Sequence, residues 1–244
     1  MTRRRTAIAV GAVAAVVIAA AAVIAFLPAS GMGGGPQALI PSSSEAPTAT
    51  PTPEQTSAPA DPSAETFAVV GDSISARTDR TGIDQSAGSW TSYAPGDGLE
   101  YRNTGWAQNG ARLAEMQLNL GEVDADVLVI LAGTNDLTAG MSIADRLAIV
   151  GQLAEQSGAA QIVVSAVPPF DPLPSASTAW NAALAVYAYQ NDYTFVDPWL
   201  ALRTTDGTYA AGQTVDGVHP TTTAAATAGA ALRVGIVAAR DAGV

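Results

Sequence analysis

Three short segments, far apart in the chain, carry the side chains best suited to chemistry. Ser73 lies in Gly-Asp-Ser-Ile-Ser and Asn135 in Gly-Thr-Asn-Asp, and both segments follow apolar runs. His219 is the sole histidine, and Asp216 precedes it by three residues in Asp-Gly-Val-His-Pro. A serine, a histidine with a nearby carboxylate and an amide able to bind an oxyanion are the parts of a serine acyl-transfer site. The leading hypothesis from the residues alone is therefore a hydrolase.

The composition excludes several other chemistries. The 244-residue chain has no cysteine and one histidine, which excludes thiol catalysis, disulfides, iron–sulfur clusters and zinc fingers and disfavours a zinc hydrolase. Its net charge of -11 and its lack of a basic stripe argue against a nucleic-acid partner. We therefore expect a reaction that needs no cofactor and no metal. All 11 basic residues are arginine and alanine is abundant, which indicates a GC-rich, bacterial genome.

The elements that would position these residues alternate between strands and helices. Short apolar runs predict five buried strands, at residues 67–71, 100–104, 127–132, 161–167 and 193–197. Helical patterns cover residues 141–156, 177–190 and 222–240, and the first of these has an apolar stripe of Ile143, Leu147, Val150 and Leu153. This alternation predicts an α/β domain with a parallel sheet covered by helices on both faces.

The candidate residues all follow predicted strands or precede a predicted helix. Ser73 follows the first strand, the loop of residues 103–110 follows the second, and Asn135 follows the third. Ligands of open parallel sheets bind beyond the carboxyl ends of the strands. If the first three strands are neighbours, these loops meet at one edge, and the loop with Asp216 and His219 can close over it.

The first 65 residues have a different character from the rest of the chain. Three arginines at residues 3–5 precede an uncharged apolar run at residues 6–27, which as a helix would span roughly 33 Å. We interpret residues 1–27 as a signal peptide or a membrane-anchor helix, and both alternatives stay open. Residues 28–65 are rich in Pro, Ser, Thr and Ala and predict a disordered linker. The catalytic domain would then lie outside the cytoplasm, secreted or anchored to the membrane.

Four sequence blocks in the right order resemble the SGNH hydrolases of the GDSL esterase/lipase superfamily. The blocks are Gly-Asp-Ser with Ser73, a glycine after the second strand, Gly-Thr-Asn-Asp with Asn135, and Asp-x-x-His-Pro with His219. The resemblance covers residues 66–244 and none of the first 65. It implies a three-layer α/β/α domain with a five-stranded parallel sheet of flavodoxin-like topology.

The resemblance also implies a role for each residue. Ser73 would be the nucleophile, His219 the general base and acid, and Asp216 the carboxylate that orients the imidazole. The backbone N–H groups of Ser73 and Gly110 and the side-chain amide of Asn135 would form the oxyanion hole. The second block contains two glycines with unusual spacing, so Gly105 is the alternative to Gly110.

Structural interpretations compete with some of these assignments. Gly-Asp-Ser alone could be a capped turn, and Asn135 with Asp136 could be a simple turn or helix cap. The four tryptophans could line a substrate site, although packing in the core is the commoner role. We single out Trp106 as the substrate-binding candidate because it lies in the second-block loop, and we interpret residues 197–199 as a structural strand end.

The predicted function is that of an extracytoplasmic serine esterase that works through an acyl-enzyme. No long apolar lid is visible, so we expect short-chain acyl or acetyl groups on a glycan or lipid. A catalytically inactive glycan- or partner-binding module on the same fold, and a thioesterase or acyltransferase, remain as alternatives. We expect an ester substrate, no nucleic acid, and contact with a membrane only through an uncleaved N-terminal helix. The acyl chain length and the oligomeric state stay open.

Overall fold

The computed structural model describes residues 64–76, 88–96 and 98–242. The predicted signal peptide or anchor at residues 1–27 lies outside the described residues, as does the predicted linker up to residue 63. Glu65, which we assigned to the linker, is already the first residue of a strand.

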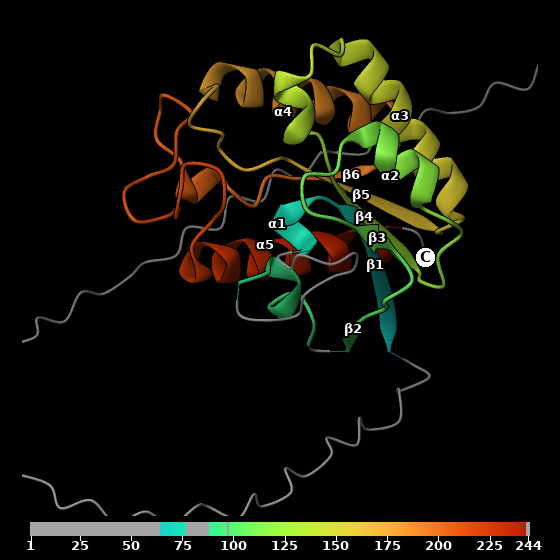
Figure 1. Ribbon diagram of the computed structural model, residues 1–244. Coiled ribbons are helices and arrows are strands. Elements are labelled where there is room, and N and C mark those ends of the chain that lie inside the picture. Colours follow the sequence, from blue (N-terminus) through green and yellow to red (C-terminus); the bar gives the residue numbers. More distant parts are fainter. Residues whose placement is uncertain (1–63, 77–87, 97, 243–244) are drawn as a thin grey trace, which may run out of the picture. The chain divides into compact units, whose positions relative to one another are not determined.

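Within the described residues, six parallel strands form one sheet at the centre of the domain (Figure 1). They are β1 (Glu65–Gly71), β2 (Leu99–Tyr101), β3 (Trp106–Ala107), β4 (Val127–Leu131), β5 (Gln161–Ser165) and β6 (Thr194–Val196). The order is β2-β1-β4-β5-β6, and β3 also pairs with β1. Without β3 this is the flavodoxin-like order, in which the chain reverses direction across the sheet between β1 and β4. The predicted fold class is therefore confirmed.

The edge beside β1 differs from the single strand predicted at residues 100–104. β2 pairs with the first half of β1, with Phe67 opposite Tyr101, whereas β3 pairs with its end, with Val70 opposite Trp106. Residues 103–105 connect these two pieces, while the Arg102 N–H still donates to Phe67 O of β1 at 2.8 Å. At Gly105 the chain passes so close to β1 that a side chain there would collide with the Val69 backbone. A close approach of this kind depends on three-dimensional packing, so a local pattern could not predict it.

Helices cover both faces of the sheet. They are α1 (Ser73–Ala76), α2 (Leu113–Asn119), α3 (Ile143–Ser157), α4 (Pro174–Gln190) and α5 (Thr222–Asp241), with short 3₁₀ turns η1 (Trp90–Ser92), η2 (Asn135–Thr138) and η3 (Leu200–Leu202). In Figure 1, α2, α3 and α4 lie on one side of the sheet and α5 on the other. The three long helices agree with the predicted ones, but α4 begins three residues earlier, at a proline suited to the first turn.

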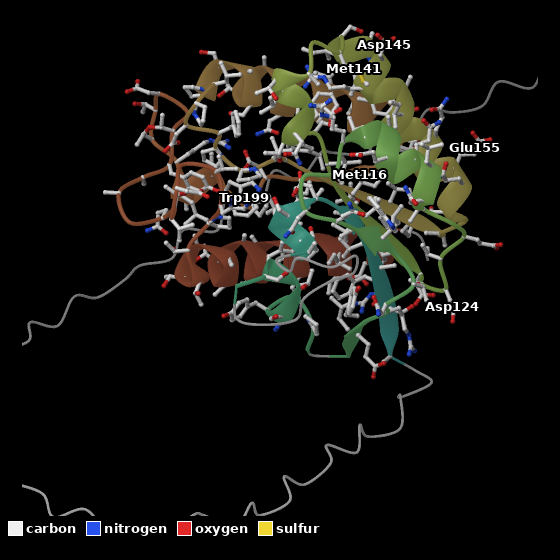
Figure 2. All side chains as sticks on the ribbon, in the orientation of Figure 1. Met116, Asp124, Met141, Asp145, Glu155 and Trp199 are labelled. Carbon is white, nitrogen blue, oxygen red and sulfur yellow. The ribbon has the colours of Figure 1, made fainter. Side chains whose placement is uncertain are left out.

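Each face of the sheet has its own hydrophobic core. Ala68 and Val70 of β1 point into the core beneath α2, α3 and α4, whereas Phe67 and Val69 point into the core beneath α5. Met116 of α2 is fully buried, while Asp124, Asp145 and Glu155 lie at the surface (Figure 2). Helix α5 is long and apolar enough to span a membrane by length and composition alone. Its buried residues, mostly alanine, glycine and leucine, instead pack on the sheet.

Replacing Gly105 by alanine should destabilise the domain by about 3 kcal/mol, the upper end of what overpacking costs, because the obstacle is backbone rather than a flexible side chain. Gly121→Ala is the matched control. A side chain at Gly121 meets nothing within 4 Å, so the free energy of unfolding should change by less than about 1 kcal/mol. Denaturant unfolding of both variants tests this, and equal stabilities would contradict the close approach.

Candidate active site

The end of β1 places Ser73 at the carboxyl edge of the sheet. Gly71 has no room for a side chain, because a Cβ would lie 2.7 Å from Ser75 Oγ and 3.1 Å from Leu131 O. The Asp72 carboxylate accepts a hydrogen bond from the Ile74 N–H at 3.0 Å and so supports the first turn of α1. Ser73 begins this turn and stays partly exposed, while Asp72 is fully buried.

Asp216 and His219 are held together within one tight loop. Asp216 Oδ1 accepts the backbone N–H groups of Val218 at 2.9 Å and His219 at 2.7 Å. Its Oδ2 lies 2.7 Å from His219 Nδ1. Gly217 turns the chain with a φ of 83°, a left-handed conformation that glycine adopts without strain. The relative position of carboxylate and imidazole is therefore set locally.

The fold brings this loop onto Ser73. His219 Nε2 lies 2.9 Å from Ser73 Oγ, although the two residues are 146 positions apart. An ionised Asp216 can only accept, so Nδ1 must carry the proton that it shares with Oδ2. Nε2 is then an acceptor, and the Ser73 hydroxyl donates to it. Hydroxyl, imidazole and carboxylate thus form one directed chain of hydrogen bonds.

The electrostatics favour an ionised Asp216. Partial burial raises the pKa of this carboxyl, but hydrogen bonds from the His219 backbone, the imidazole and the Val218 backbone together hold the pKa below its usual value. The His219 side chain is 30% exposed and that of Asp216 is 50% exposed. The imidazole is therefore both paired with a carboxylate whose ionised form is favoured and open to an incoming substrate.

Two residues that the sequence did not single out brace this loop from behind. The Tyr209 hydroxyl donates to Val218 O at 3.1 Å, and the Asp171 N–H donates to Gly217 O at 2.9 Å. Asp171 Oδ1 in turn accepts the Tyr209 N–H at 2.8 Å. Both residues lie in irregular segments without a recognisable spacing relative to His219, so no sequence signal identifies them.

Asn135 lies at the neighbouring strand end, on the other side of Asp72. Its Nδ2 donates to Ala111 O at 2.9 Å and lies 3.5 Å from Asp72 Oδ2. The first contact joins the loop after β4 to the loop that contains Gly110. The structure therefore brings the Ser73, Asn135 and Gly110 segments together, as predicted from the blocks.

The two candidate glycines have different environments. Gly105 packs against β1, whereas Gly110 is exposed, has a φ of 75° and directly precedes Ala111. Within the described part of the chain, the N–H groups of Ser73 and Gly110 donate to no protein acceptor. Gly110, rather than Gly105, is therefore the glycine next to the residue that Asn135 contacts.

Burial dominates the titration of Asp72. Loss of hydration raises the pKa of this carboxyl to about 6, while the Ile74 N–H and the charge that His219 carries when it is protonated oppose the shift. The nearby negative charge of Asp136 raises it further. Asp72 therefore changes its charge in the pH range where histidine side chains also titrate.

The tryptophans lie mainly in the core. Trp90, Trp180 and Trp199 are fully buried, and Trp106 is partly buried against the core beneath α2, α3 and α4. The substrate-binding role of Trp106 stays a prediction. Among the described residues, no three histidine or acidic side chains gather in a way that could hold a metal ion.

Comparison with known proteins identifies the family. The model of the GDSL-like Lipase/Acylhydrolase family matches residues 69–226, which include all four sequence blocks. The chain belongs to this family. As a GDSL-like hydrolase of the SGNH superfamily, it is a serine enzyme acting on ester bonds.

Solved structures with the same fold are distant in sequence. A GDSL-like lipase from Bacteroides thetaiotaomicron has 20% identity and a TM-score of 0.57 over 72% of this chain and 89% of its own. A catalytic mutant of an acetylxylan esterase from Geobacillus stearothermophilus has 18% identity and a TM-score of 0.57 over 71% and 94%. The native M. smegmatis aryl esterase has 18% identity and a TM-score of 0.55 over 72% and 100%. No curated protein matches the chain.

The raised pKa of Asp72 gives this GDSL-like hydrolase a specific pH dependence of stability. The pKa of Asp72 is higher in the folded protein than its ordinary value of 3.8, so the folded protein becomes less stable relative to the unfolded one as Asp72 ionises. The free energy of unfolding should therefore fall by about 3 kcal/mol between about pH 4 and 6 through this group, and stay lower above pH 6. Asp72→Asn should lack this decline. Denaturant unfolding of both proteins from pH 3.5 to 8 measures the difference. Identical pH dependences of the two proteins would contradict the raised pKa of Asp72.

Proposed function

We propose that this GDSL-like hydrolase is an extracytoplasmic esterase that removes short acyl groups, acetyl foremost, from glycan or lipid alcohols. The observation that carries the catalytic part is the hydrogen-bonded chain from Ser73 Oγ through His219 to Asp216. Ser73 is the nucleophile, His219 the general base and Asp216 the residue that orients the ring.

The reaction follows from these positions. His219 Nε2 takes the Ser73 proton as Oγ bonds to the ester carbonyl carbon, and Asp216 stabilises the imidazolium. Collapse of the tetrahedral intermediate breaks the bond to the alcohol, which leaves with the proton from Nε2. A water molecule then gives its proton to Nε2 and attacks the acyl-enzyme. The second collapse releases the acid and returns the proton to Ser73.

The carbonyl oxygen becomes negative in both steps, and three N–H donors can stabilise it. They are the backbone groups of Ser73 and Gly110 and the Asn135 amide. One amide hydrogen is engaged by Ala111 O. Among the described residues the other has only the long 3.5 Å contact with Asp72, and it is the one available to the oxyanion.

The preference for small acyl groups and bulky alcohols rests on exposure. Half-exposed Asp216 and partly exposed His219 and Ser73 leave the centre accessible to a large alcohol, and an acetylxylan esterase shares the fold. The predicted apolar segment at residues 1–27 and the linker at residues 28–65 support a location outside the cytoplasm. An intact chain of hydrogen bonds disfavours the inactive binding module.

A fluorophosphonate probe tests the assignment of Ser73. The wild-type protein should be labelled, whereas Ser73→Ala should lose labelling and about 10⁴-fold or more of its esterase activity. The reason is that, among the described residues, no other hydroxyl bonds to the imidazole of His219. Ser142→Ala, at the exposed start of α3, is the control and should be labelled normally. Labelling that survives in Ser73→Ala removes this serine from its role.

Nitrophenyl esters of increasing chain length test the acyl preference. We expect kcat/KM to be highest for acetate and to fall by about tenfold or more for octanoate, because no long apolar lid is visible in the sequence. Addition of simple alcohols to the same assay separates hydrolysis from acyl transfer. Faster turnover of octanoate would overturn the short-chain assignment and leave the esterase assignment standing.

A further inference from the structure

A buried arginine lies behind the loop that carries Asn135. Arg146 of α3 is 8% exposed, and its guanidinium carbon lies 4.7 Å from the centre of the Trp180 ring. Its Nε and Nη1 atoms are buried and have no hydrogen-bond partner among the described residues. Stacking on an indole stabilises a cation in part, but a buried guanidinium also needs an anion and hydrogen-bond acceptors.

Asp136 supplies the opposite charge. It is 1% exposed, its Oδ2 accepts the Leu113 N–H at 3.1 Å, and its Oδ1 is buried without a partner in the described part of the chain. Burial raises the pKa of Asp136, whereas the Leu113 N–H and the charges of Arg146 and Arg112 oppose the shift. Asp136 and Arg146 thus interact electrostatically, yet they do not form a direct ion pair within the described residues.

This charge pair is linked directly to the oxyanion donors. Asp136 bonds to Leu113, and the adjacent Asn135 bonds to Ala111, so two hydrogen bonds join the loop after β4 to the segment that follows Gly110. Trp180 of α4 also holds the start of this loop, because its indole N–H donates to Ala132 O at 3.1 Å.

We propose that Arg146 and Asp136 form a water-bridged buried charge pair that positions Asn135 for oxyanion binding. Buried polar atoms in folded proteins almost always have partners, and a buried water typically makes about three hydrogen bonds. One bridging water that donates to Asp136 Oδ1 and accepts from one Arg146 N–H gives each of the two charged side chains a partner. Arg146 is a positioning residue, since it acts on the reaction through Asp136 and Asn135. The inference rests on the proposed role of Asn135.

A double-mutant cycle tests this coupling. Arg146→Met keeps the length of the side chain but removes the larger of the two positive charges that act on Asp136. The kcat for nitrophenyl acetate should therefore fall about 10- to 100-fold, with KM changed less than about threefold. Asp136→Asn keeps an oxygen for the Leu113 N–H and removes the negative charge. The double variant should therefore regain most of the lost kcat. Arg240→Met, on α5 and remote in sequence from the blocks, is the matched control and should keep the wild-type kcat.

Two results would overturn the proposal. One is a double variant as impaired as Arg146→Met, and the other is an Arg146→Met variant that loses stability while its kcat stays at the wild-type value. A high-resolution crystal structure of the wild type tests the proposal even if the variants fail to fold. An ordered water within hydrogen-bonding distance of Asp136 Oδ1 and an Arg146 nitrogen is expected, and its absence there contradicts the bridge. If the wild type hydrolyses no ester, only the proposed function falls, and the water still decides the charge pair.

Discussion

Three buried indole rings fix the points at which the strands of the site end. Each ring donates its N–H group to an atom just beyond a strand: Trp90 to Ser75 Oγ, Trp180 to Ala132 O and Trp199 to Ala166 O. A buried indole N–H without an acceptor is costly, so these bonds hold the loops after β1, β4 and β5 at defined positions. The loops with Ser73 and Asn135 start from two of these anchored ends. Placement of the reacting groups therefore depends on side chains that never touch the substrate.

Patterns in the sequence predicted those parts of the fold that depend on local order. β4 and β5 are continuous apolar runs with both faces buried, and α3 has a capping serine before it and a glycine after it. The edge beside β1 was not predictable in the same way. Its break into β2 and β3 reflects the passage of Gly105 across the Val69 backbone, which no local pattern reveals. Short α2 was missed because seven residues offer too few turns to show a period.

In the site, too, contacts between residues close in sequence could be predicted, whereas contacts between distant residues could not. The relation of Asp216 to His219 could be predicted, because it is formed within one turn of the chain. Bracing by Tyr209 and Asp171 could not, since their contacts are backbone groups of a separate loop. Arg146 did leave a signal that we did not use. It lies three residues after Ile143 and four before Val150, on the apolar stripe of α3, where a charged residue is unexpected.

The separation of the two halves of the catalytic centre along the chain has a consequence for assembly. The contact between Asp216 and His219 can form as soon as residues 216–219 adopt their turn. The Ser73 hydroxyl, in contrast, lies 146 positions upstream of His219 and meets it only in the folded domain. Secondary structure alone therefore does not create a competent enzyme. During refolding, hydrolytic power returns only when the C-terminal loop docks against the end of the first strand. The onset of turnover thus reports that this loop has docked on the first strand, and the loss of turnover reports that the two have separated.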